Sequence, residues 1–165
     1  MKRDIFLTAT AAFALLTPLA AMAQSETTDT REIVVTGRSL KDTADALAAC
    51  LARGCPPDQD VAATLAHAEN LFIGGDYDNA RTTLLRSVSR NRKHGAAYPV
   101  PVSDLFRANS RVAQHMGEGK NFQLSVLDMR DTLKKGLGED DPRTLVAQIE
   151  VGDSRAKLGH PDEAT

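Results

Sequence analysis

The sequence predicts an all-α protein made of stacked antiparallel helical hairpins, an α-solenoid whose last hairpin is incomplete. Apolar residues recur at helical spacing over most of the chain. Gly75, Gly117 and Gly159 follow one another at intervals of 42 residues. The composition is 42% hydrophobic with no Trp and two Tyr, which suits packed helices better than a sheet. A period of this length is typical of helical hairpins that bury their apolar faces against neighbouring hairpins.

Residues 1–23 have the pattern of a secretory signal peptide. Basic Lys2 and Arg3 precede an apolar run, Ile5–Ala20, and an A-x-A cleavage motif ends at Ala23. The run is shorter than the roughly 20 residues that a transmembrane helix needs. We therefore expect export to the periplasm or secretion, cleavage before Gln24, and no stable membrane insertion after cleavage.

Residues 24–38 should form a flexible leader that contains one short strand. The segment opens with small polar residues and continues with a β-branched run that Gly37 closes. A solitary strand either packs along a helix or adds to the sheet edge of another protein. The residues that could add in this way are Glu32, Ile33, Val34, Val35 and Thr36.

Cys50 and Cys55 are the two cysteines of the chain. An exported protein meets an oxidising compartment, so a local disulfide between them is the favoured interpretation. Metal binding is the weaker alternative, because two thiols without nearby His or acidic partners do not complete a tetrahedral site. The spacing excludes a redox C-x-x-C motif.

Helical spacing, glycines and prolines predict six helices. The first occupies residues 39–56 and ends at Gly54, Pro56 and Pro57. A repeat domain over residues 57–165 follows. Its helices are expected at residues 61–72, 78–92, 102–116, 121–135 and 143–158.

The turn GDYDNAR, from Gly75 to Arg81, resembles the middle of a tetratricopeptide repeat. In that family a glycine ends the first helix, an aromatic residue follows two positions later, and alanine opens the second helix. Ala68, Leu71 and Leu84 match the flanking small and apolar positions of the motif. The resemblance implies a helical-repeat scaffold that binds other proteins.

The segment Leu137–Ala164 resembles the 42-residue repeats of the kinesin-light-chain type, which begin with an L-G-E-D-x-P loop. The middle unit departs from the pattern, because Phe122 stands where alanine is expected and no aromatic residue follows Gly117 by two positions. We therefore expect the turn at Gly117 to be built differently from the turn at Gly75.

Neither an enzyme nor a nucleic-acid-binding protein is expected. The formal net charge is −2, which gives no attraction for nucleic acid. The sequence holds no G-x-S-x-G, phosphate-loop or H-E-x-x-H motif, and its four histidines are scattered. We accordingly expect no catalytic residues, no metal site and no cofactor.

In tetratricopeptide proteins the first helix of each repeat lines a concave groove, so the resemblance implies which residues face a partner. Arg107, Arg111 and His115 share one helix face. Two guanidiniums there could grip a carboxylate of a bound peptide, unless the face is a solvated one that Asp104 neutralises. The candidate groove residues are Leu65, Glu69, Phe72, Ile73, Arg107, Arg111, His115, Ile149, Asp153 and Lys157.

The run from Glu32 to Gly37 resembles the Ton box, the segment near the mature N-terminus of TonB-dependent receptors that adds as a strand to TonB. The favoured function is an exported protein-interaction adaptor that binds a peptide or protein of the cell envelope in its groove. The alternative is a Ton-system accessory that engages TonB through this strand. With either function, the uncapped third repeat could join two copies into a homo-oligomer.

Overall fold

The computed structural model describes residues 38–159, and these residues have the predicted all-α fold. They form six α-helices and one short 3-10 helix, with no strand among them. The predicted signal peptide, leader and Ton-box-like strand lie outside the described residues, as does the segment after Gly159. The helices are α1 (Leu40–Arg53), α2 (Pro57–Ile73), α3 (Tyr77–Asn91), η1 (Arg92–His94), α4 (Pro99–His115), α5 (Gly119–Leu137) and α6 (Pro142–Lys157).

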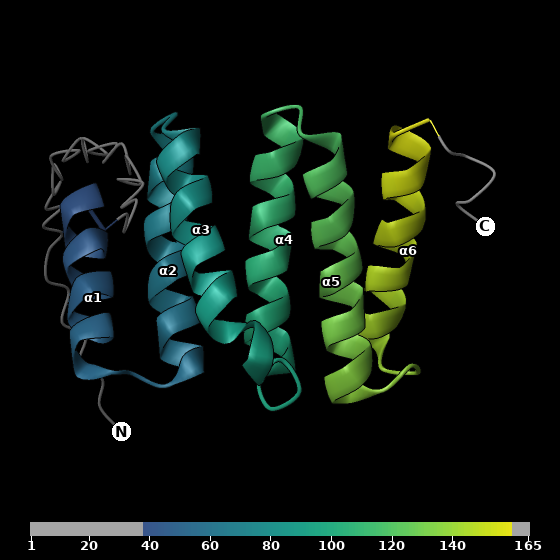
Figure 1. Ribbon diagram of the computed structural model, residues 1–165, viewed down its shortest axis with the longest axis horizontal. Helices are drawn as coiled ribbons and strands as arrows, with labels where there is room; N and C mark the ends of the chain where they lie inside the picture. Colours follow the sequence, from purple (N-terminus) through teal and green to yellow (C-terminus); the bar gives the residue numbers. More distant parts are fainter. Residues whose placement is uncertain (1–37, 160–165) are drawn as a thin grey trace, which may run out of the picture. The chain divides into compact units, whose positions relative to one another are not determined.

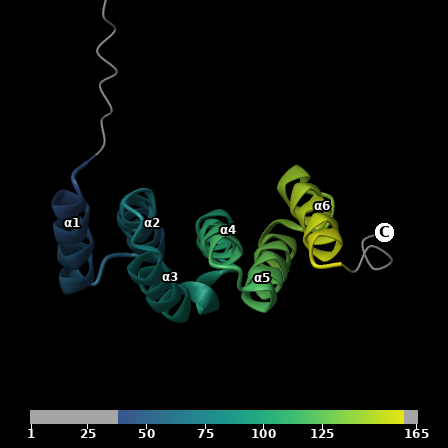
Figure 2. The ribbon, with the colours of Figure 1, turned by 90° about the horizontal axis from the view of Figure 1, so that it is seen from above.

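Each α-helix packs against the helices next to it in the chain, so the helices lie side by side in sequence order (Figure 1). The α2–α3 and α4–α5 pairs are the predicted hairpins, and α6 follows as a single arm. Helix α2 also packs directly on α4, whereas α3 and α5 lie on the other side of the array (Figure 2). This two-layer arrangement places one face of α2 beside one face of α4.

The core runs through the array as a continuous set of buried apolar side chains. Leu84, Val102, Leu105, Met129 and Leu133 are almost completely buried, and they come from α3, α4 and α5. Among the described helices, none combines the length and the hydropathy that crossing a bilayer requires.

Two helices begin three or four residues earlier than the sequence predicts, and in both the first residue is proline. Helix α2 begins at Pro57 instead of residue 61, and α4 begins at Pro99 instead of residue 102. The helix bounds expected from the sequence leave both prolines outside a helix. Proline is well suited to the first helical position, because its φ angle is already helical and its missing N–H would have no partner there.

The prediction that the turn at Gly117 differs from the turn at Gly75 was wrong. Gly75 has φ 80° and Gly117 has φ 74°. The next residues also agree, with φ −88° and ψ 68° at Asp76 and φ −87° and ψ 68° at Glu118. Glycine at a positive φ angle, followed by a capping residue, determines the turn, and neither Tyr77 nor the alanine position is needed.

A repeated contact between an acidic residue and an asparagine was not recognised in the sequence, although its spacing is visible there; only Asp76 also accepts a bond from a helix backbone N–H. Asn79 donates a side-chain hydrogen bond to Asp76, and Asn121 donates the equivalent bond to Glu118, at 2.7 and 2.8 Å. The signal is a glycine, an acidic residue and an asparagine three positions later, at Gly75 and again at Gly117. It indicates the same turn in both hairpins.

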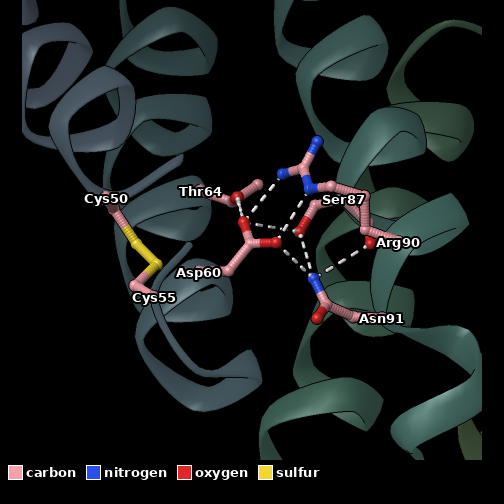
Figure 3. Close-up of polar contacts among 7 residues, drawn as sticks. All are labelled: Cys50, Cys55, Asp60, Thr64, Ser87, Arg90 and Asn91. Carbon is pink, nitrogen blue, oxygen red and sulfur yellow. Dashed lines mark hydrogen bonds and ion pairs between the residues drawn. A yellow bond between two sulfur atoms is a disulfide. The ribbon is translucent and has the colours of Figure 1, made fainter. Parts of the chain in front are cut away.

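A buried carboxylate joins α2 to α3 (Figure 3). Asp60 accepts hydrogen bonds from Arg90 Nε at 2.8 Å, from Arg90 Nη2 at 2.7 Å and from Asn91 Nδ2 at 2.7 Å. Thr64 donates to the same carboxylate at 3.1 Å. These contacts join the last turn of α3, which contains Arg90, to the first turn of α2, which contains Asp60.

Helix α1 is attached to α2 by few side chains. Thr43 and Cys50 are its buried residues. A disulfide joins Cys50 to Cys55 at the connection to α2, with a Cα–Cα distance of 5.2 Å (Figure 3). Asn70 of α2 donates hydrogen bonds to Thr43 Oγ1 and to the Arg38 carbonyl.

Candidate partner-binding groove

A cleft of about 370 Å³ lies between α2 and α4. The spacing of the lining residues follows from the helices, because residues three or four apart on a helix share a face. From α2 this face presents Leu65, Glu69 and Phe72, and from α4 it presents Arg107 and Arg111. Leu84, Ala68, Ala108 and Val112 add an apolar floor. The cleft thus combines an apolar interior with a charged rim.

A second cleft, of about 210 Å³, lies between α4 and α6. Arg107 and Arg111 line this cleft as well, opposite Asp153 and Lys157. Phe122, with Ser110 and Ser154 as small neighbours, forms part of its wall. Because the two arginines belong to both clefts, the clefts form one groove along α2, α4 and α6. We call this surface the α2/α4/α6 groove.

Both arginines of the groove are already paired with carboxylates of the same chain. Arg111 Nη1 lies 3.3 Å from Glu69 Oε2. Arg107 contacts Glu150 at 3.2 Å and Asp104 at 3.4 Å. These pairs are long and their side chains are 37–55% exposed, so each contributes little, about 0–1 kcal/mol. A carboxylate of a partner could therefore displace Glu69 or Glu150 at small cost.

Asp104 lines the first cleft beside Arg107. Burial raises the pKa of its carboxyl above the usual value, and the nearby Arg107 guanidinium offsets part of that rise. The neutralising role for Asp104 that we considered from the sequence is visible in the structure, because Asp104 contacts Arg107. Glu69 and Glu150 share this role, and the role of Glu150 was missed.

Three rings gather at one end of the groove. The Phe72 ring lies 5.3 Å from the Tyr77 ring and 5.4 Å from the His115 ring, and the Tyr77 and His115 rings are 4.1 Å apart. These distances are typical of edge-to-face and tilted aromatic contacts. His115 therefore lies against the rings of Phe72 and Tyr77.

The structure brings together most of the predicted groove residues. Leu65, Glu69, Phe72, Arg107 and Arg111 line the first cleft, and Asp153 and Lys157 line the second. His115, Ile73 and Ile149 line neither cleft, and the two isoleucines are 75% and 65% exposed. Ile73 is the last residue of α2, and Ile149 lies one turn before Asp153, at the edge of the α6 face that lines the second cleft.

Within residues 38–159, no three His, Cys, Asp or Glu side chains are placed to hold a metal ion together. Comparison with protein-family models and with curated proteins finds no match to this chain.

Proposed function

We propose that the protein is an exported adaptor that binds an extended or helical peptide of a cell-envelope protein in the α2/α4/α6 groove. The observation that supports this proposal most directly is the cleft between α2 and α4, whose apolar floor is bordered by two arginines. An apolar pocket with a few polar groups at its rim is the common design of a peptide-binding site. The resemblance of the turns to tetratricopeptide repeats supports the same class of function.

The contacts in the groove indicate what kind of peptide fits. An apolar side chain would fill the space between Leu65, Phe72 and Leu84. A carboxylate of the peptide would take the place of Glu69 beside Arg111, where a planar guanidinium can bind two oxygens. The displaced Glu69 and Glu150 could receive a cationic side chain of the same peptide. A peptide with an apolar anchor between charges of both signs satisfies all three requirements.

Affinity capture tests the groove. The parent protein and an Arg107→Ala, Arg111→Ala variant are each immobilised and exposed to envelope extract, and the retained proteins are identified by mass spectrometry. A matched control, Arg86→Ala with Arg143→Ala, removes the same charge from exposed positions outside both clefts. We expect a partner that the parent and the control retain and that the groove variant loses.

The segment of the captured partner that binds is then identified and synthesised as a peptide. Calorimetry measures the binding of this peptide to the parent, the groove variant and the control. Loss of about 1–3 kcal/mol in the groove variant, with none in the control, would support direct binding at the arginines. If the parent, the groove variant and the control all retain the same partners, the groove is not the binding site. Deletion of Glu26–Arg38 then tests the alternative Ton-linked function, in which capture depends on the strand.

Export is tested separately. Cell fractionation and the intact mass of the purified protein show whether residues 1–23 have been removed. A cytoplasmic protein that retains Met1 would reject the proposed location, although it would leave the groove proposal open to the capture experiment.

A further inference from the structure

Helix α6 carries an apolar stripe on the side opposite its buried face. The buried face consists of Thr144, Ala147, Val151 and Ser154. On the other side Leu145 is 52% exposed and Ile149 is 65% exposed, and Val146 beside them is 53% exposed. The stripe residues follow the helical spacing i, i+4, i+7 and i+11, and they are Leu145, Ile149, Gly152 and Ala156. This α6 stripe is separate from the α2/α4/α6 groove, since none of the four lines either cleft.

The size of the side chains changes along the α6 stripe. Leu145 and Ile149, which are large, lie in the first half of the helix, whereas Gly152 and Ala156, which are small, lie in the second half. A helix rises about 1.5 Å per residue, so two antiparallel copies that cross midway between residues 150 and 151 are in register. Leu145 then faces Ala156 of the second copy, and Ile149 faces Gly152 of the second copy. Large side chains meet small ones at every position of the stripe.

The charges at the two ends of α6 favour the same antiparallel orientation. The residues just before the helix are Glu139, Asp140 and Asp141, and the last turn carries Arg155 and Lys157. Glu139 already contacts Lys134 and Asp141 already contacts Arg143, so the acidic end is partly neutralised within its own chain. Antiparallel pairing brings the acidic end of one helix beside the basic end of the other, and it also opposes the two helix dipoles. Parallel pairing would place large side chains against large ones and like charges against like charges.

We propose that the α6 stripe joins two copies of this protein into a two-fold symmetric dimer. A two-fold axis requires a patch that is complementary to itself, and the large-to-small order of the stripe meets this requirement only when the helices run antiparallel. A single helix pair buries less surface than a tight complex does, so the dimer should dissociate in the micromolar range. The groove faces of both copies remain available, and the dimer would present two binding sites.

Sedimentation equilibrium of the purified protein across a range of concentrations tests the dimer. We expect the parent to change from monomer to dimer with rising concentration. Ile149→Arg should keep the protein monomeric, because it places two charges at the centre of the contact. Leu124→Arg, at an exposed leucine of α5, is the matched control and should associate as the parent does.

The variant Gly152→Leu tests whether association depends on large side chains meeting small ones or only on exposed apolar surface. Leucine favours the helix more than glycine does, so the monomer should stay folded, as circular dichroism can verify. Ile149 of the other copy would then meet a large side chain, and association should weaken about tenfold or more. The double variant Ile149→Ala, Gly152→Leu places a small residue opposite the new leucine and should recover most of the lost association.

A monomeric mass at every concentration would overturn the proposal and leave the stripe to a different partner. Stronger association of Gly152→Leu than of the parent would also overturn it, because association would then depend on the amount of apolar surface and not on the match of large and small side chains.

Discussion

Among residues 38–159, Asp60 is the one charged residue whose side chain is buried. The residue is 5% exposed, and two donors of Arg90 and one of Asn91 surround its carboxylate. A carboxylate with this many donors is held in place, but removal of its charge leaves those donors without an acceptor of equal strength. We expect Asp60 to stabilise the α2–α3 hairpin and to have no part in partner binding.

Replacement of Asp60 by asparagine should lower the free energy of unfolding by about 2–3 kcal/mol, because Arg90 loses its ionic partner and Asn91 meets an amide instead of a carboxylate. Urea unfolding of parent and variant measures the difference. Asp58→Asn is the matched control, since Asp58 lies on the same helix turn but is exposed. Its effect should stay within about 0.5 kcal/mol, and equal losses in the two variants would contradict the assigned role.

The stability that Asp60 contributes should depend on pH. Burial raises the pKa of its carboxyl, but hydrogen bonds from Arg90 and Asn91 and the Arg90 charge together lower it below the usual value. A lowered native pKa contributes stability that is fully present above the unfolded pKa of about 3.9 and is lost as the pH falls through the native pKa. The difference in unfolding free energy between parent and Asp60→Asn should therefore be constant from neutral pH to about pH 5 and should shrink below about pH 4. A difference that widens in acid would show that the pKa is raised.

At the scale of single elements, the turns at Gly75 and Gly117 have the same backbone conformation in the two hairpins. Gly75 and Gly117 both have positive φ angles, and open space surrounds the position that a Cβ atom would take at each. A substitution is thus opposed by the backbone conformation and not by a steric clash with a neighbour.

Gly75→Ala and Gly117→Ala should each cost about 1–2 kcal/mol of unfolding free energy, because alanine is strained in the left-handed region. Asparagine tolerates this conformation better, so Gly75→Asn and Gly117→Asn should cost less and serve as controls. Thermal or denaturant unfolding of the four variants makes the comparison. Clearly unequal costs at the two glycines would contradict the finding that the two turns are the same.

Helix α1 buries few side chains, so we expect its disulfide to contribute a large part of its stability. Thr43 and Cys50 are its buried residues, and two exposed leucines, Leu40 and Leu51, contribute little to burial. Closure of a short loop by the Cys50–Cys55 bond contributes about 2 kcal/mol by restricting the unfolded chain.

Reduction of the bond, or the double variant Cys50→Ser, Cys55→Ser, should raise hydrogen exchange across α1 while the exchange of α4 and α5 stays nearly unchanged. Mass spectrometry of peptides from the exchanged protein measures this. The reducing agent applied to the double variant is the control and should have no further effect. An equal rise in exchange across all helices would show that the disulfide stabilises the whole array.

At the scale of the whole helical array, stability should be graded along the chain. Contacts run from each helix to the next, with α2–α4 as an added pair, as expected for a repeat protein in which each unit depends on its neighbours. Helices α4 and α5 have neighbours on both sides and contain Leu105 and Met129, which are fully buried.

Amide hydrogen exchange in the parent should therefore be slowest in α4 and α5 and fastest in α1 and α6. Leu105→Ala should cost about 3–5 kcal/mol, because it leaves a cavity in the most deeply buried region, and it should accelerate exchange in every helix. Uniform protection from α1 to α6 in the parent would indicate a single cooperative unit in place of a graded array.

The sequence was sufficient for the fold class, the order of the helices and the period of the repeat, because local signals specify these features. Helical spacing of apolar residues marks each helix, and glycine at a positive φ angle ends a helix whatever side chains follow it. The same local signals were misjudged at Pro57 and Pro99, where proline begins a helix, and at Gly117, where Phe122 suggested a difference that the backbone does not have.

The pairing of side chains across helices was decided by the tertiary structure alone. Arg107 and Arg111 could be placed on one helix face from their spacing, but not beside Glu150 and Glu69, which lie 43 and 42 residues away in the chain. The contact between Asp60 and Arg90 likewise depends on how α2 meets α3. Spacing along one helix is fixed by the helix itself, whereas contacts between helices depend on the angle and the depth at which their side chains pack, and these come from the sum of many small interactions across the core.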